Sequence, residues 1–247
     1  MTDEFVVSRT ERGTPVSSWL EWQPAWPPLI TETWERVVVV AAHPDDDVLG
    51  IGGLLAHLVQ RGVEIVGIQA TDGTAAYPHS PTVSPDELGR LRTAEIREAY
   101  ARLGLPEPVH LGLPDGALAD HEDRLTELLG EFLRPGDRWL APWRADRHPD
   151  HEAAGRAAAR ACEGAPVEFF EYPIWMWHWA APRSAQVPWG RALRLDLSPA
   201  ERLAKRKAAL CFRTQIAPLS DHPADAAVLP PFALERLTTD REVVFGA

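Results

Sequence analysis

Two short segments of the chain concentrate histidine and aspartate. The first holds four such residues within five positions, namely His43, Asp45, Asp46 and Asp47. The second holds four within six positions, namely Asp146, His148, Asp150 and His151. Neutral imidazole and carboxylate suit zinc and related divalent cations, and a catalytic zinc takes three protein ligands and leaves a place for water. Together the two segments predict a divalent-metal site.

A site of this kind suits the hydrolysis of an amide. Zinc lowers the pKa of a bound water from about 15.7 to roughly 7 and polarises a carbonyl group. A carboxylate must then accept the proton, and another group must stabilise the tetrahedral oxyanion. The two segments contain enough groups for these tasks. Taken singly, each has an ordinary explanation, because an Asp-Asp-Asp run is usually a solvated turn or a helix cap and a His-x-x-His pair often arises by chance.

The residues around each segment predict the elements that position it. Val37 to Ala42 is a fully apolar, mostly β-branched run, typical of a strand buried on both faces of a parallel sheet. After the first segment, apolar residues recur at helical spacing from Leu49 to Val59, and Gly62 ends that helix. Arg138 to Ala141 is another predicted strand, and it precedes the second segment. Further strands are predicted at 63–70, 109–111, 167–172 and 193–197, and further helices at 85–103, 125–133, 152–162 and 198–210.

The alternation of strands and helices predicts an α/β fold with a Rossmann-like, open, mostly parallel sheet flanked by helices. Ligands of such folds bind at the carboxyl ends of the strands, so both segments should meet in one cleft. We expect residues 35–247 to form a single domain. Residues 1–34 are rich in tryptophan and proline, which predicts an arm without regular helix. Its tryptophans would pack on the domain, or else form an oligomer contact or a pocket rim.

The two segments resemble the signatures of a known family. Ala42-His43-Pro44-Asp45-Asp46, continued by Gly50 and Gly53, and His148-Pro149-Asp150-His151 with Gly155 are similar to the two motifs of the PIG-L/LmbE zinc-dependent N-deacetylases. The resemblance extends from about Arg36 to Gly155. It implies an LmbE-like fold and hydrolysis of an N-acyl group, typically acetyl, from a glucosamine-type sugar or sugar conjugate.

The resemblance also implies roles for single residues. His43, Asp46 and His151 match the ligands of one Zn²⁺ per chain, for which Fe²⁺ or Co²⁺ could substitute. Asp45 matches the general base, and His148 matches the histidine that stabilises the oxyanion or assists protonation. Asp47 stands where the family commonly has glutamate, which keeps the charge on a shorter side chain.

Two further matches concern the substrate. Arg92, in Arg92-Thr93-Ala94-Glu95, and Asp115, in Leu113-Pro114-Asp115-Gly116, resemble positions that face the sugar. Without the resemblance, Arg92 and Glu95 would be an ordinary helix pair, and Asp115 would belong to a simple turn. The aromatic segment 175–179, which contains His178, could stack on a sugar ring as a substrate wall. It could instead form an apolar clamp that covers the sheet or joins subunits.

Composition excludes some classes of partner. The formal net charge is −11, from 25 basic and 36 acidic residues, which argues against nucleic acid or an anionic membrane as the main partner. No apolar run approaches the roughly 20 residues of a membrane-spanning helix, and Met1 to Arg12 has no signal-peptide pattern. The two cysteines, Cys162 and Cys211, suggest reduced thiols in a cytoplasmic protein. We expect a small N-acyl amino-sugar substrate and leave a homo-oligomer open.

Two other functions fit part of the pattern. Asp45, Asp46 and Asp47 could hold a divalent metal and a nucleotide diphosphate, as in a sugar transferase, although the sequence shows no nucleotide-binding motif. The chain could also be a non-catalytic, metal-containing binding protein. The candidate base and ligands, all present, argue against that alternative.

Overall fold

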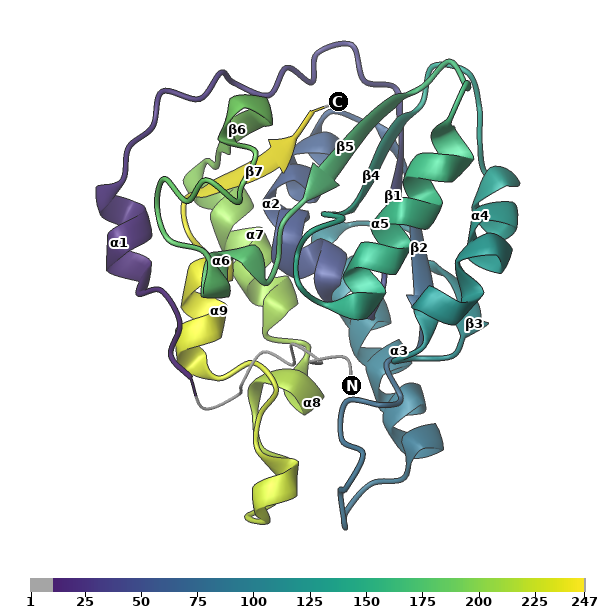
Figure 1. Ribbon diagram of the computed structural model, residues 1–247, viewed down its shortest axis with the longest axis vertical. Helices are drawn as coiled ribbons and strands as arrows, with labels where there is room; N and C mark the ends of the chain where they lie inside the picture. The colour runs from purple at the N-terminus through teal and green to yellow at the C-terminus, as the bar shows by residue number, and fades with distance from the viewer. Residues whose placement is uncertain (1–10, 247) are drawn as a thin grey trace.

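Strand β1 (Arg36–Ala41), whose six residues are all buried, lies inside a seven-stranded sheet. The computed structural model of the protein describes residues 11–246, and the strand order is β3-β2-β1-β4-β5-β7-β6 (Figure 1). The other strands are β2 (Glu64–Thr71), β3 (Val109–Leu113), β4 (Arg138–Pro142), β5 (Glu168–Tyr172), β6 (Ala192–Asp196) and β7 (Arg241–Phe245). The pairs from β3 through to β5 are parallel, and β7 is antiparallel to both of its neighbours. The predicted fold class is therefore confirmed.

Helices cover both faces of the sheet because side chains alternate along β1. Val37 and Val39 belong to the core beneath α2 (Asp46–Gln60) and α3 (Pro85–Leu103). Val38 and Val40 belong to the core on the other face, beneath α5. The remaining helices are α1 (Val16–Glu21), α4 (Glu122–Gly130), α5 (Pro149–Cys162), α6 (Met176–Trp179), α7 (Pro199–Ala209), α8 (Arg213–Ile216) and α9 (Pro231–Leu237), with 3₁₀ turns η1 (Leu118–His121), η2 (Trp189–Arg191) and η3 (Pro223–Asp225).

The N-terminal segment runs along the outside of the sheet past β6 (Figure 1). Residues 1–10 of the predicted arm lie outside the described residues. Pro28 forms an isolated bridge with Arg194, so the segment pairs with the strand at this edge of the sheet. The expectation of no regular helix was wrong, because α1 fits between Pro15 at its N-cap and Pro24, where proline does not interrupt it.

Helix α2, which begins at the first histidine–aspartate segment, is kinked. Ile51 has φ −136° and ψ 23°, so the helix is interrupted one turn after its start. The interruption frees backbone N–H groups. The carboxylate of Glu242 on β7 accepts hydrogen bonds from two of them, the N–H of Gly53 at 2.8 Å and that of Leu54 at 2.7 Å. Lys205 on α7 lies 2.7 Å from the same carboxylate, and both side chains are 3% exposed. At the kink, the backbone N–H groups of α2 are thus bound by a carboxylate from β7 that is paired with a lysine from α7.

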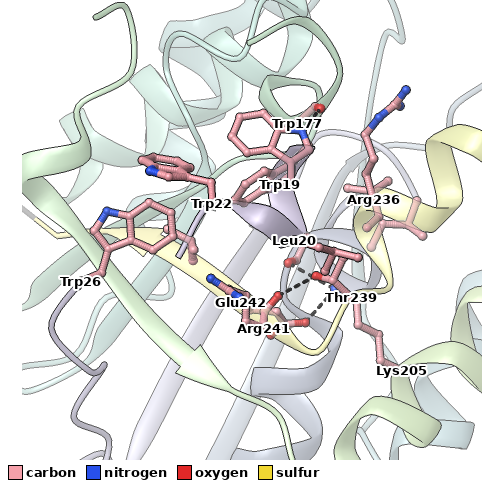
Figure 2. Close-up of a pocket in the computed structure, with 14 residues that line it drawn as sticks. Trp19, Leu20, Trp22, Trp26, Trp177, Lys205, Arg236, Thr239, Arg241 and Glu242 are labelled. Carbon is pink, nitrogen blue, oxygen red and sulfur yellow. Dashed lines mark hydrogen bonds and ion pairs between the residues drawn. The ribbon is translucent and has the colours of Figure 1, made fainter. Parts of the chain in front are cut away.

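A pocket lined by tryptophan lies above this ion pair. Figure 2 shows Trp19, Trp22, Trp26 and Trp177 gathered on one side of it, with Lys205 and Arg236 on the other. The Trp19 and Trp177 rings meet edge to face at 5.0 Å, and the Trp19 indole N–H donates to the Trp177 carbonyl at 2.9 Å. The arm is therefore held to the α6 segment by aromatic packing and a hydrogen bond. Within residues 11–246, no helix is both long and apolar enough to cross a bilayer.

Candidate active site

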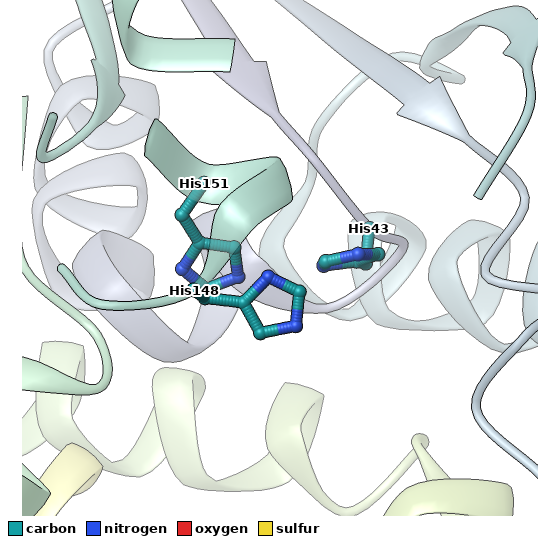
Figure 3. A group of neighbouring side chains, drawn as sticks. All are labelled: His43, His148 and His151. Carbon is teal, nitrogen blue, oxygen red and sulfur yellow. The ribbon is translucent and has the colours of Figure 1, made fainter. Parts of the chain in front are cut away.

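The two histidine–aspartate segments meet at the carboxyl ends of β1 and β4. His43 follows β1, and Asp46 begins α2. His148 stands at the N-cap of α5, where Pro149 occupies the first helical position, and His151 lies in the first turn. Figure 3 shows the three imidazoles gathered where the end of β1 faces the N-terminal end of α5. They line a cavity of about 430 Å³.

Glycine lets these elements approach each other. A Cβ atom on Gly155 of α5 would lie 2.3 Å from the carbonyl oxygen of Pro142, at the end of β4. No side chain fits there, so glycine at this position of the second motif allows α5 to pack directly on the strand end. This contact holds α5, which carries His151, against the end of β4.

The carboxylate of Asp46 lies between two imidazoles. Its Oδ2 is 3.2 Å from His43 Nδ1, and its Oδ1 is 3.1 Å from His151 Nε2. Ligand atoms of a tetrahedral zinc with bonds of about 2.0 Å are roughly 3.3 Å apart, so each of these two contacts has the separation of a pair of zinc ligands. Among residues 11–246, two groups of three side chains have ligand atoms that all lie within 4.8 Å of one another, namely His43, His148 and His151, and His43, Asp115 and Asp150. Both groups share His43 with the predicted ligand set, and Asp46 belongs to neither.

Other carboxylates fix the orientation of both imidazoles. His151 Nδ1 lies 2.8 Å from Asp146, which is fully buried and also accepts backbone N–H groups from residues 174–176. His43 Nε2 lies 3.1 Å from Asp115 and 3.2 Å from Asp150. A carboxylate on the outer nitrogen of a ligating histidine sets its tautomer and raises its basicity. Each candidate ligand nitrogen therefore has such support.

The site attracts positive charge. Burial lowers the pKa of His43 and His151, but the surrounding carboxylates, Asp46 foremost, outweigh burial in both. The pKa of His43 lies well above its usual value, and that of His151 is raised to about 9. Burial raises the pKa of Asp46, but the charges of His151 and His43 hold it well below its usual value. Such a cluster of anionic groups attracts cations, and the protons on His43 and His151 must leave before either imidazole binds a metal.

Asp45 lies beside the ligand set in the same cavity. Burial raises its pKa above the usual value, against the opposing charge of Arg92, whose guanidinium is 3.2 Å from Asp45 Oδ1. Arg92 also donates to the carbonyl of Gly73 at 3.0 Å. A carboxylate with a raised pKa is suited to accept and return a proton near neutral pH.

His148 is the histidine that is held neutral. Burial, reinforced by the charges of His151 and His43, brings its pKa well below the usual value. Its ring stacks on that of His151 at a centroid distance of 4.5 Å. Its Nδ1 atom is buried and has no hydrogen-bond partner among residues 11–246. His148 is thus a neutral imidazole that lines the cavity and has a free nitrogen.

Asp47 points away from this chemistry. Its carboxylate, fully buried, accepts hydrogen bonds from the Tyr100 hydroxyl, the Gln69 amide and the Val48 N–H. Burial raises the pKa of Asp47 to about 6. The residue connects α2 to β2 and α3, so its role in this structure is packing of the helix that carries Asp46.

Comparison with known proteins assigns the family. Residues 38–162, about half of the chain, match the family model described as PIG-L, GlcNAc-PI de-N-acetylase. The chain belongs to the PIG-L family. The PIG-L match includes both histidine–aspartate segments, so the resemblance seen in the motifs is confirmed.

PIG-L relatives include deacetylases of two kinds of amino sugar. A 1D-myo-inositol 2-acetamido-2-deoxy-α-D-glucopyranoside deacetylase of Mycobacterium sp. (strain KMS) is 31% identical over an alignment of 176 residues that covers 61% of this chain and 56% of the relative. A diacetylchitobiose deacetylase of Thermococcus kodakarensis is 30% identical over an alignment of 128 residues that covers 49% of this chain and 46% of the relative. The chain therefore spans about half the length of these curated relatives.

A solved structure shares the fold of this chain over a longer stretch. A conserved protein of Thermus thermophilus superposes with a TM-score of 0.57 at 28% identity, over 81% of this chain and 84% of that one. The similarity extends beyond residues 38–162 and supports the observed arrangement of the sheet.

The structure brings every predicted site residue into one cavity. Its lining includes all seven of them, namely His43, Asp45, Asp46, Arg92, Asp115, His148 and His151. Arg92 and Asp115, predicted to face substrate, also contact Asp45 and His43. The aromatic segment divides, because Trp175 lines the cavity whereas Trp177 lines the tryptophan pocket and His178 contacts Arg236 of α9.

Three contributors were not predicted. Asp146 and Asp150 belong to the second segment, but nothing in their spacing showed that they contact the ring nitrogens of His151 and His43 that face away from Asp46. Gln215 of α8 lines the cavity and donates to Thr214, whose N–H and hydroxyl bind Glu95 of α3. Glu95 and Thr214 are 119 positions apart in the sequence, so no local pattern predicts their hydrogen bonds.

Proposed function

We propose that this protein hydrolyses an N-acyl group, chiefly acetyl, from a glucosamine-type sugar or sugar conjugate, with one divalent cation held by His43, Asp46 and His151. The observation that carries the proposal is the Asp46 carboxylate between two imidazoles, with Asp45 and His148 lining the same cavity. The names of the PIG-L relatives, which are deacetylases of N-acetylated sugars, support the substrate class. We propose zinc as the cation, and Fe²⁺ or Co²⁺ as substitutes.

The cation, when bound, supplies Lewis-acid polarisation of the amide carbonyl and increases the acidity of water. Asp45 accepts the proton of the attacking water and delivers a proton to the departing amine, a role that a carboxylate beside the reacting atoms with a raised pKa can fill. His148, neutral and with a free nitrogen, donates a hydrogen bond to the oxyanion. Arg92 holds the Asp45 carboxylate in position through their ion pair.

Asp115 is the remaining polar group placed to bind sugar. One carboxylate oxygen faces His43 Nε2 at 3.1 Å, and the other accepts the N–H of Ala75 at 2.6 Å. It lines the cavity near Gly116, and its two oxygens can still accept hydrogen bonds from hydroxyl groups. We assign Asp115 to sugar binding and to the orientation of His43.

A cytoplasmic location and a small-molecule partner remain predictions.

The Asp45→Asn variant tests the proposal. Acetate release from N-acetylglucosamine derivatives by the zinc-loaded protein should fall by roughly 10²–10⁴-fold, the usual contribution of a general base. The zinc content should stay close to one per chain, because Asp45 is not among the ligands. An exposed variant, Asp123→Asn, serves as the control. Near-normal turnover by Asp45→Asn would refute the assigned role, and turnover only with added nucleotide would favour a transferase.

A further inference from the structure

The active-site cavity has an apolar wall that the proposed reaction does not use. Its members are Leu49, Ile174, Trp175, Val228 and Leu229, from α2, the segment after β5 and the segment before α9. All five belong to one hydrophobic cluster. Leu49, Ile174 and Leu229 are buried, and the other two are half-buried. Three distant parts of the chain thus contribute the wall, and the same hydrophobic core supports all of them.

The polar groups of the cavity lie outside this wall. Arg92, Asp115, His43 and His151 come from other elements, whereas Asp46 lies at the start of α2, one turn before Leu49. None of the five wall residues carries a charge or a side-chain hydrogen-bonding group apart from the Trp175 indole. Trp175 and Val228, the half-buried members, offer apolar surface that the hydroxyl groups of a sugar do not match. The cavity, at about 430 Å³, is within the usual size of small-molecule sites, which bury both apolar and polar parts of a ligand.

The wall is fixed in place. Asp146 accepts the backbone N–H groups of Ile174 at 3.0 Å and Trp175 at 2.9 Å, and the same carboxylate holds His151. The N–H of Leu229 donates to the carbonyl of Gln215 at 2.8 Å. A surface that is already ordered costs a ligand little conformational entropy. One buried carboxylate thus sets the position of both a candidate metal ligand and the wall.

From this arrangement we infer that the substrate carries an apolar group of several carbons that packs on the wall while its amide faces Asp45 and His148. The inference rests on the proposed function and names the substrate more closely, as an amino-sugar conjugate. The apolar group is either the acyl chain itself or the aglycone at the anomeric carbon, since both would place methylene groups beside the sugar. Burial of each methylene group should raise binding roughly fourfold.

Two substrate series test the inference and distinguish these sources. In the first, methyl, butyl and hexyl glycosides of N-acetylglucosamine vary the aglycone. In the second, N-acetyl, N-butanoyl and N-hexanoyl forms of the methyl glycoside vary the acyl chain. The value of kcat/KM should rise at least tenfold along one series, and that series locates the apolar group. Flat values along both would overturn the inference while leaving the proposed function intact.

Two wall variants should remove the chain-length preference. Val228→Thr keeps nearly the same shape but adds a hydroxyl group, and Trp175→Ala removes most of the half-buried surface. Each should lower the ratio of kcat/KM for the hexyl or hexanoyl substrate to that for the shortest substrate at least fivefold. Val109→Thr, at an exposed valine on β3, is the matched control and should keep the preference. An unchanged preference in both wall variants contradicts the inference.

The wall can also be tested without turnover. If no N-acyl sugar is hydrolysed, the proposed function fails, and calorimetry with hexyl and methyl glucoside then examines the wall alone. The hexyl compound should bind at least tenfold more tightly to the wild-type protein than to Val228→Thr. Equal affinity would overturn the inference. Thermal unfolding of each variant verifies that it is folded.

Discussion

Arg92 and Asp45 form a buried ion pair beside the candidate metal site. The guanidinium lies 3.2 Å from the carboxylate, with side-chain exposures of 4% and 8%. The arginine of the Arg-x-x-Glu motif therefore contacts the proposed base directly. Close contact is possible because Gly73 faces Arg92, where a Cβ atom would lie 2.1 Å from the guanidinium.

Replacement of Arg92 should change the pH dependence of the reaction. Arg92 lowers the pKa of Asp45, so Arg92→Gln should raise it, and the acidic limb of the kcat/KM profile should move to higher pH. Arg92→Lys keeps the positive charge, so its acidic limb should lie between those of the wild-type protein and Arg92→Gln. A higher KM with an unmoved limb would instead indicate that Arg92 acts only on the substrate.

Removal of the cation should abolish activity and lower thermal stability. A chelator should stop acetate release, and zinc should restore it. Zinc at a hundred times its Kd should add about 2.7 kcal/mol to the free energy of unfolding, because it binds the folded state. The His151→Ala variant should show little of this stabilisation. An equal zinc-induced rise in Tm for that variant would remove His151 from the ligand set.

Neutralisation of Asp146 should weaken metal binding without touching a proposed ligand. Asp146→Asn keeps the shape of the side chain but loses the charge that orients His151 Nδ1. The zinc affinity should fall roughly 10–100-fold, as is usual for the partner of a ligating histidine. Competition with a chromophoric chelator measures this change, with Asp123→Asn as the control. Unchanged affinity would show that Asp146 serves only the Trp175 segment.

Disruption of the ion pair at the kink should destabilise the protein. Lys205→Met leaves Glu242 without its buried counterion and should cost about 3–5 kcal/mol in urea unfolding. The double variant Lys205→Met with Glu242→Gln should cost less than the sum of the single changes, because no charge stays buried alone. Additive costs would mean that the two residues do not interact.

Glu171 should contribute to stability at acid pH. Burial raises its pKa, but hydrogen bonds from Arg144 and the Arg191 side chain outweigh burial, so the pKa lies below the usual value of 4.5. The unfolded state thus binds more protons below about pH 4.5, and the stabilisation is lost as the pH falls through the folded-state pKa. Glu171→Gln should flatten this part of the unfolding profile. Glu168→Gln, at the exposed end of the same strand, should leave the slope unchanged.

Local patterns in the sequence were sufficient to predict most of the sheet and the main helices. Helix α3 was predicted at its observed bounds, because Ser84 caps it and Gly104 ends it in the left-handed conformation. Motif residues at the ends of two buried strands also had to meet, since parallel strands present their carboxyl ends at one edge.

Features that depend on contacts between distant residues were missed. β7 was not predicted, although it is as long as four strands that were, because its partners β5 and β6 lie far back in the chain. The pairing of Lys205 with Glu242 likewise has no local signal. Arg92 illustrates the same point within the site, because the motif marks the residue but only the fold shows that it contacts Asp45.

The contact between Glu242 and the start of α2 has a consequence for biosynthesis. Glu242 lies 189 residues after Gly53, whose N–H it accepts. A ribosome therefore exposes the histidine–aspartate helix long before the carboxylate that closes its kink is made. The nascent protein should acquire a properly shaped catalytic centre only once β7 has been released and has joined the sheet.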